Sequence, residues 1–309
     1  KRRPPSMLLA SRGRASARLI SAAALAYIPG SSQASGPRRG IRLDVAAVIM
    51  PHPDKERTGG EDAVFTLRNT FGVFDGVGGW ADAGIDSGEF SRSLARHTAA
   101  AVERRLPGSG ECVDLVGALR EGVHAVQEPG SCTACIVHVA EDGKFSALNL
   151  GDSGFRVLRS LVGDVLKPAV QSTQQQHYFN CPLQLGTGSR DMPEHGDRYS
   201  GTLHPGDLLV LATDGCFDNL FDDEISSLLE PVLRAERDAS HLASLLGEAA
   251  RTASLQTKRR TPFSASAKEH GYFFPGGKVD DVTVICVRIL ARDAAVDGHN
   301  EELPPRSKL

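Results

Sequence analysis

Hydrophobic and polar positions along the chain follow two different periods. Short segments rich in Val, Ile, Leu and Phe that end at Gly, Asp or Asn are typical of strands. Segments with apolar residues every three or four positions are typical of amphipathic helices. The predicted strands lie at 62–67, 70–76, 134–140, 144–154, 207–215 and 281–290, and the predicted helices at 87–102, 115–126, 225–233 and 242–246, the first with a cap at Ser87. Because these elements come in clusters, the pattern favours an α+β fold of antiparallel sheets covered by helices.

The same pattern divides the chain into three parts. Residues 44–292 form the predicted domain, since about 250 residues suit one globular unit. Within it, residues 251–278 are irregular, basic and aromatic, and we expect them to form the longest loop. Residues 293–309 are a polar C-terminal tail, and residues 1–43 form a leader of different composition.

The leader is basic, whereas the rest of the chain is acidic. Residues 1–43 hold nine Lys or Arg residues and no acid, which leaves 26 basic against 38 acidic residues in the remainder. Arg-, Ser- and Ala-rich composition without acids predicts a transit peptide that is disordered or cleaved. Two alternatives stay open: a secretory signal, although Arg12, Arg14 and Arg18 interrupt its apolar stretch, and a basic arm without a targeting role.

Charge and composition also exclude several classes of function. The acidic body argues against binding a nucleic-acid backbone, and no apolar run approaches the roughly 20 residues of a membrane span. Six cysteines are few for a disulfide framework in 309 residues, so we interpret them as reduced thiols. Cys132 and Cys135 form a CxxC pair without a second pair, and we expect them to pack within strands.

Carboxylates recur at the ends of predicted strands. Asp62 opens one strand and Asp75 closes the next, so an antiparallel hairpin places both at one sheet edge. Asp214 closes a strand and Asp280 opens another, which gives the same arrangement if the two strands are neighbours. Clustered carboxylates repel unless a cation lies between them. Oxygen ligands without nearby Cys or His suit Mg²⁺ or Mn²⁺.

Five motifs resemble those of the metal-dependent type 2C (PPM) protein serine/threonine phosphatases. In order they are RTGGED (57–62), FDGVGG (74–79), NLGDSG (149–154), LATDGCFDN (211–219) and DDVT (280–283). The resemblance covers residues 57–289 and is greatest to the branch of the mitochondrial matrix. It implies a four-layer α-β-β-α sandwich, in which two antiparallel sheets lie face to face and helices cover both outer faces.

The resemblance also implies roles for individual residues. Asp75 would bridge two Mn²⁺ or Mg²⁺ ions beside the Gly76 carbonyl, with Asp214 and Asp280, rather than Asp281, as ligands of one ion. Glu61 and Asp62 would hold water bound to the ions or orient Arg57.

Three further residues complete these implied roles. Arg57 would grip the substrate phosphate, a bidentate task that suits arginine. Asp152 and Asp218 resemble ligands of a weaker third ion, although Asp152 in GDSG also suits a simple turn.

The implied function is hydrolysis of phosphoserine or phosphothreonine in proteins by in-line attack of a water that bridges the two ions. We expect phosphoprotein substrates, a monomer and a mitochondrial location. The alternative is a catalytically weak pseudophosphatase that binds proteins. Many family members have histidine, the expected general acid, where this chain has Val77. His177 is the candidate replacement, with a structural role as its alternative.

Overall fold

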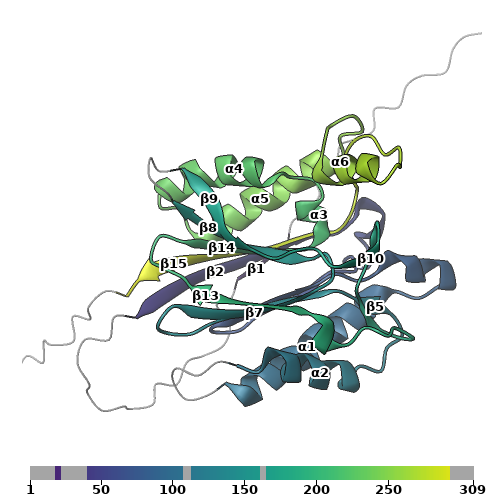
Figure 1. The fold of residues 1–309 in the computed structure, drawn as a ribbon, viewed down its shortest axis with the longest axis horizontal. Coiled ribbons are helices and arrows are strands. Elements are labelled where there is room, and N and C mark those ends of the chain that lie inside the picture. Colours follow the sequence, from purple (N-terminus) through teal and green to yellow (C-terminus); the bar gives the residue numbers. More distant parts are fainter. Residues whose placement is uncertain (1–17, 22–39, 107–112, 161–164, 293–309) are drawn as a thin grey trace, which may run out of the picture.

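Two antiparallel sheets lie face to face and carry helices on both outer sides (Figure 1). The structure is a computed structural model and describes residues 18–21, 40–106, 113–160 and 165–292. The predicted four-layer α-β-β-α sandwich is therefore confirmed. The tail at 293–309 and most of the leader lie outside the described residues.

Among the described residues, the larger sheet has six strands and the smaller has five. The six lie in the order β1 (Arg18–Ser21), β2 (Ile41–Met50), β15 (Val282–Ala291), β14 (Leu208–Ala212), β8 (Gly154–Ser160) and β9 (Leu166–Gln171). The five lie in the order β13 (Asp197–Thr202), β7 (Lys144–Leu150), β6 (Ala134–Val139), β4 (Thr70–Phe74) and β3 (Ala63–Thr66). Two short pairs join β5 (Ser131–Cys132) to β12 (Leu185–Gly186) and β10 (Gln176–Tyr178) to β11 (Cys181–Pro182).

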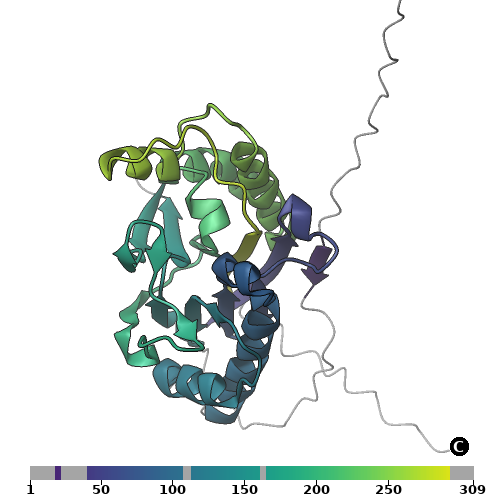
Figure 2. The ribbon, with the colours of Figure 1, turned by 90° about the vertical axis from the view of Figure 1, so that its right-hand side faces the viewer.

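The helices form the outer layers, which Figure 2 shows on opposite sides of the sheets. α1 (Ser87–Arg105) and α2 (Leu115–Ala125) cover the five-stranded sheet. α4 (Asp222–Arg234) and α5 (Ala239–Ser254) cover the six-stranded sheet, with the short α3 (Asp214–Phe217) and α6 (Pro262–Glu269) at one end. Three 3₁₀ turns complete the described elements: η1 (Pro53–Lys55), η2 (Gly78–Ala83) and η3 (Pro193–His195). None of the described helices is long and apolar enough to cross a membrane.

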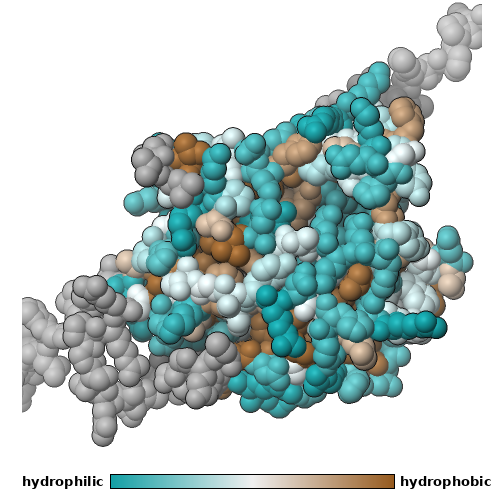
Figure 3. All heavy atoms as spheres, in the orientation of Figure 1, coloured by the Kyte–Doolittle hydropathy of each residue, from teal (hydrophilic) through white to brown (hydrophobic). Residues whose placement is uncertain are grey.

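Alternation along the strands builds three apolar layers. In β14, Val210 faces the core beneath α4 and α5, whereas Leu209 and Leu211 face the core between the sheets. Successive strand side chains point to opposite faces, so a strand covered on both sides is apolar throughout. The surface in Figure 3 is mostly hydrophilic, with apolar residues in small patches.

Several local predictions need correction. The segment 251–278 is not one loop, because α5 continues to Ser254 and Thr261 caps α6 by accepting from Ser264 N. The cap of α1 is Asp86 rather than Ser87, since Asp86 Oδ1 accepts from Gly88 N at 2.9 Å. Strands β2, β8, β9 and β13 had no counterpart in the prediction. Their exposed or mixed positions gave weaker apolar runs than those of the central strands.

The boundary between leader and body falls inside a strand. The described segment opens at Gly40 and β2 begins at the next residue, Ile41, so residues 41–43 belong to the six-stranded sheet. Within the leader, β1 pairs with β2 from Arg18 opposite Ile49 to Ser21 opposite Ala46. The remaining leader residues, 1–17 and 22–39, are outside the described residues, and the transit-peptide interpretation stays a prediction.

Candidate metal centre

Two strand pairs bring the predicted carboxylates to one end of the sandwich. In the β3–β4 hairpin, Ala63 pairs with Phe74, so Asp62 and Asp75 flank the same edge. β14 and β15 are neighbours, as the prediction required, and Thr213 N donates to Thr283 O at 3.1 Å just before Asp214. The predicted hairpin of β3 with β4 and the predicted pairing of the second two strands are thus confirmed.

Three of these carboxylates form a compact cluster. One oxygen from each of Asp75, Asp152 and Asp214 lies within 4.8 Å of the others. Asp152 comes from the turn between β7 and β8, and Asp214 begins α3 after β14. The cluster therefore joins residues from both sheets, which is where a shared cation would offset their repulsion.

The donor set fits a divalent cation that prefers oxygen. Asp62 Oδ1 and Asp214 Oδ1 are buried, and neither has a hydrogen-bond partner among the described residues. Asp62 Oδ2, in contrast, accepts from Thr213 Oγ1 at 2.8 Å. Buried carboxylate oxygens without partners are costly unless a cation binds them. Such all-oxygen sites suit Mg²⁺ or Mn²⁺.

The protonation of the cluster reflects crowding. Burial, followed by repulsion from Asp214, raises the pKa of Asp75 and of Asp152 well above the ordinary range. The same causes raise the pKa of Asp280 to about 7. For Asp218, burial outweighs the nearby Lys278 ammonium and raises the pKa to about 6. Each of these shifts marks a site that gains from positive charge.

Lys278 provides one positive charge inside the cluster. Its Nζ forms an ion pair with Asp214 and lies 3.0 Å from Asp218 Oδ2 and 3.3 Å from Asp280 Oδ2. Burial alone would lower the pKa of Lys278, but the surrounding carboxylates outweigh it and hold the pKa well above its usual value. The ammonium is therefore fixed beside the predicted ligands.

Asp280 and Asp281 point to different partners. Asp280 Oδ2 faces Lys278, and repulsion from Asp214 contributes to its raised pKa. Asp281 instead accepts from the backbone N of Glu61 at 2.6 Å and from that of His52. Asp281 thus secures the segment before β3, which leaves Asp280 as the candidate ligand.

Glu61 and Gly76 lie on the hairpin side of the cluster. Glu61 is buried and its Oε2 forms an ion pair with Lys55. A Cβ on Gly76 would lie 2.6 Å from Glu61 O, so the close approach of these two backbones requires glycine. The close approach of the Gly76 and Glu61 backbones therefore fixes the position of both residues.

Two predicted residues are placed away from these contacts. Arg57 is exposed in the turn after η1, and none of the described residues forms a hydrogen bond or ion pair with it. His177 in β10 is exposed, and its Nε2 lies 2.9 Å from Asp191 Oδ2. No described hydrogen bond joins His177 to the cluster, which favours the structural role.

Sequence reasoning missed the lysines. Lys278 was assigned to the irregular loop, although its position two residues before Asp280 was a usable signal. Lys55 lies before the first motif and had no signal of its own. The interpretation of the CxxC pair is confirmed: Cys132 packs in the core under α1 and α2, and Cys135 packs between the sheets.

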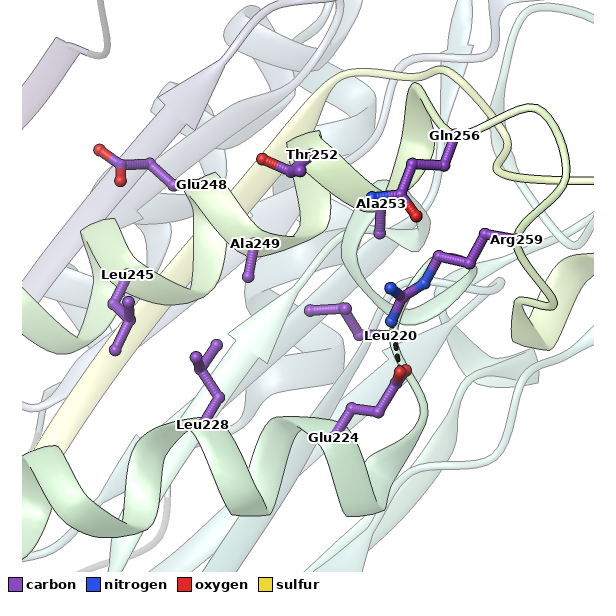
Figure 4. Close-up of a pocket in the computed structure, with 10 residues that line it drawn as sticks. All are labelled: Leu220, Glu224, Leu228, Leu245, Glu248, Ala249, Thr252, Ala253, Gln256 and Arg259. Atoms are coloured by element: carbon purple, nitrogen blue, oxygen red, sulfur yellow. Dashed lines mark hydrogen bonds and ion pairs between the residues drawn. The ribbon is translucent and has the colours of Figure 1, made fainter.

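A surface pocket of about 420 Å³ lies elsewhere, between α4 and α5 (Figure 4). Leu220, Leu228 and Leu245 line its apolar wall, and the ion pair of Glu224 with Arg259 closes one end. None of the clustered carboxylates lines it. The pocket is therefore separate from the carboxylate cluster.

Comparison with known proteins gives a consistent result. The family profile described as Protein phosphatase 2C matches residues 73–248. "Probable protein phosphatase 2C 80" of Arabidopsis thaliana is 39% identical over 269 residues, which cover 84% of this chain and 63% of that protein. "Protein phosphatase PTC7 homolog fig" of Drosophila erecta is 36% identical, covering 76% of this chain and 78% of the relative. The chain spans about half the length of several plant relatives that it matches.

Solved structures share the fold. The X-ray structure of the photosystem II phosphatase PBCP superposes with a TM-score of 0.71 at 30% identity and covers 80% of this chain and 98% of that one. The catalytic domain of the serine/threonine phosphatase PstP, in complex with two manganese ions, gives a TM-score of 0.57 at 19% identity. It covers 81% of this chain and 99% of its own, and at this identity the likeness concerns the fold alone.

Proposed function

The chain belongs to the protein phosphatase 2C family, and from this premise we propose that it hydrolyses phosphoserine or phosphothreonine in proteins with two Mn²⁺ or Mg²⁺ ions. The observation that carries the proposal is the pair of buried, unpartnered oxygens on Asp62 and Asp214 beside the cluster of Asp75, Asp152 and Asp214. A protein-binding module would gain nothing from buried carboxylates that lack partners.

In this proposal the carboxylates hold the ions. Asp75 and the Gly76 carbonyl would hold the ions from the side of the five-stranded sheet, and Asp214 and Asp280 from the side of the six-stranded sheet. Bound there, the ions would lower the pKa of a water between them and neutralise charge on the phosphoryl group.

The surrounding residues position this site. Thr213 Oγ1 donates to Asp62 Oδ2, which leaves Asp62 Oδ1 without a donor among the described residues and available to a bound cation. Asp281 fixes the backbone of Glu61, which keeps the hairpin against β15. Arg57 is exposed and without a partner among the described residues, so its guanidinium is free to bind a substrate phosphate in a bidentate manner.

The test is hydrolysis of p-nitrophenyl phosphate and of a phosphothreonine peptide by the 309-residue chain. We expect activity with added Mn²⁺ or Mg²⁺ and none in excess chelator. Asp75→Ala and Asp214→Ala should lower turnover by more than the roughly 10- to 100-fold that loss of an outer-shell partner costs. Glu103→Ala, at an exposed acid on α1, is the matched control and should keep full activity.

The pseudophosphatase alternative has a distinct outcome in this assay. It predicts no turnover with any divalent cation, although the chain stays folded by circular dichroism. Activity that persists in excess chelator would instead contradict the two-ion mechanism. The presence of all the core carboxylates favours the enzyme over this alternative.

We also propose that the protein acts in mitochondria. The support is the acid-free basic composition of residues 1–43 and the similarity to the PTC7 homolog. The similarity to a photosystem II phosphatase and to plant relatives makes the plastid the competing destination, because plastid transit peptides share this composition.

A further inference from the structure

Lys278 lies beside Asp218, one of the two acids for which the resemblance implied a third, weaker metal ion. The other acid of that pair is Asp152. The Lys278 ammonium forms an ion pair with Asp214 and lies 3.0 Å from Asp218 Oδ2. Only 17% of the lysine side chain is exposed, so the charge is held within the site rather than in solvent.

Neighbouring residues fix the position of this lysine. Asn219 Oδ1 accepts from Lys278 N at 2.9 Å, and Asn219 Nδ2 donates to Lys278 O at 2.8 Å. The same Nδ2 donates to Gly215 O at 2.9 Å, which links the lysine to α3. The ring of Phe263 lies 5.2 Å from Nζ, within the range of a cation–π contact. Two hydrogen bonds with Asn219 and one contact with the ring of Phe263 therefore hold the lysine in place.

Asp218 differs from the other cluster acids in its hydrogen bonding. Its Oδ2 faces Lys278 and its Oδ1 accepts from Gln174 Nε2 at 3.5 Å. Asp214 Oδ1 and Asp62 Oδ1, in contrast, have no partner among the described residues. Both oxygens of Asp218 thus accept from protein donors, whereas Asp214 and Asp62 each keep one buried oxygen without a donor among the described residues.

We propose that the Lys278 ammonium replaces a third divalent cation at Asp218, so that this protein binds two ions where the third position is already filled. The inference rests on the proposed function, because it concerns the same carboxylates. A divalent cation bound at Asp218 would lie within a few Å of a fixed positive charge, and repulsion at that separation is large in a partly buried site.

The experiment counts bound Mn²⁺ by equilibrium dialysis and isothermal titration calorimetry on the 309-residue chain, without substrate. We expect two ions for the wild type. Lys278→Met removes the charge but keeps a similar side-chain length, and it should bind a third ion. Its affinity at that position should rise by at least about tenfold. Lys278→Arg keeps the charge and should bind two.

The matched control is Lys258→Met, at an exposed lysine that precedes α6 and lies outside the carboxylate cluster. It should bind two ions with wild-type affinity. Lys278→Gln provides a second neutral variant in case Lys278→Met does not fold. In metal-free buffer both neutral variants should melt at a lower temperature than the wild type and should recover more on addition of Mn²⁺.

Each outcome bears on the proposal. Three ions in the wild type overturn it by themselves, whatever the variants do. Two ions in both the wild type and the neutral variants, with unchanged affinities, also overturn it while leaving the proposed function intact. A wild-type chain that binds no divalent cation overturns the inference and the proposed function together.

Discussion

Val77 is an apolar residue two positions after Asp75, between β4 and η2. Its backbone is extended, with φ of −70° and ψ of 110°, and its N–H donates to Ser131 O at 2.9 Å. The side chain is half-buried and holds no proton to transfer. Any L-residue adopts this backbone, so a histidine here would cause no backbone strain.

We predict that Val77→His raises turnover of phosphoserine or phosphothreonine peptides relative to p-nitrophenyl phosphate. An alkyl leaving group needs a proton more than an aryl one does, and a positioned acid typically contributes about 10² to 10⁴ in rate. The measurement is kcat against leaving-group pKa, with a pH profile that should gain one ionisation.

His177→Ala is the companion variant for the Val77 prediction. Its ring pairs with Asp191 rather than with a cluster acid, so we expect little change in leaving-group dependence. A wild type whose kcat is independent of leaving-group pKa, and stays so in His177→Ala, would contradict our account of Val77.

At the scale of elements, α3 and the segment before β15 approach each other at Gly215. A Cβ on this residue would lie 1.9 Å from the backbone O of Asp281. That contact is with main chain, which cannot rotate away as a side-chain end can. The separation of Asp214 from Asp280 therefore depends on a residue without a side chain.

We predict that Gly215→Ala moves the two segments apart and weakens both fold and metal binding. Overpacking of this kind costs on the order of 1–3 kcal/mol, and each kcal/mol lowers the melting temperature by roughly 2–4 °C in a domain of this size. Thermal denaturation and Mn²⁺ titration measure the two effects.

The control for Gly215→Ala is Gly79→Ala. A Cβ on Gly79 meets nothing within 4 Å, and the change should leave melting temperature and Mn²⁺ affinity at their wild-type values. If both variants behave alike, the close approach at Gly215 does not determine the geometry of the site.

On the scale of the whole molecule, the fold concentrates acids whose pKa values are raised. Burial and neighbouring carboxylates raise the pKa of Asp280 to about 7 and that of Asp218 to about 6. The folded chain therefore binds more protons than the unfolded chain between about pH 4 and pH 7, and stability must fall as pH rises through this window.

We predict that the metal-free chain melts at a higher temperature at pH 5.5 than at pH 7.5. Each pKa unit corresponds to about 1.4 kcal/mol. Saturating Mn²⁺ should remove or reverse the difference, because cations take the place of the protons. Calorimetry at both pH values measures this, and a metal-free melting temperature that rises from pH 5.5 to 7.5 would show that the acids are not crowded in solution.

A second prediction at this scale concerns targeting. Residues 7–43 fused to a fluorescent reporter should direct it into mitochondria, since they are basic and free of acids. Replacing Arg12, Arg14 and Arg18 by glutamate should abolish import. A reporter that enters plastids, enters the secretory pathway or stays in the cytosol would refute the mitochondrial location and leave the enzymatic proposal unaffected.

The sequence by itself determined the local features of this protein. Alternation and helical spacing identified the central strands and four helices, because side-chain direction repeats with the period of the element. The placement of Asp62 and Asp75 followed from a short hairpin, whose register a three-residue turn fixes. Motif order then indicated the family, since each motif is contiguous in the chain.

Only the tertiary structure decided how distant segments meet. Lys278 reaches Asp214 across 64 residues, and Asp281 binds the backbone of Glu61 across 220. Periodicity assigns a residue to a face but does not state which element packs there, so neither contact had a local signal. The charge balance of the cluster, and with it the role proposed for Lys278, arises from that packing.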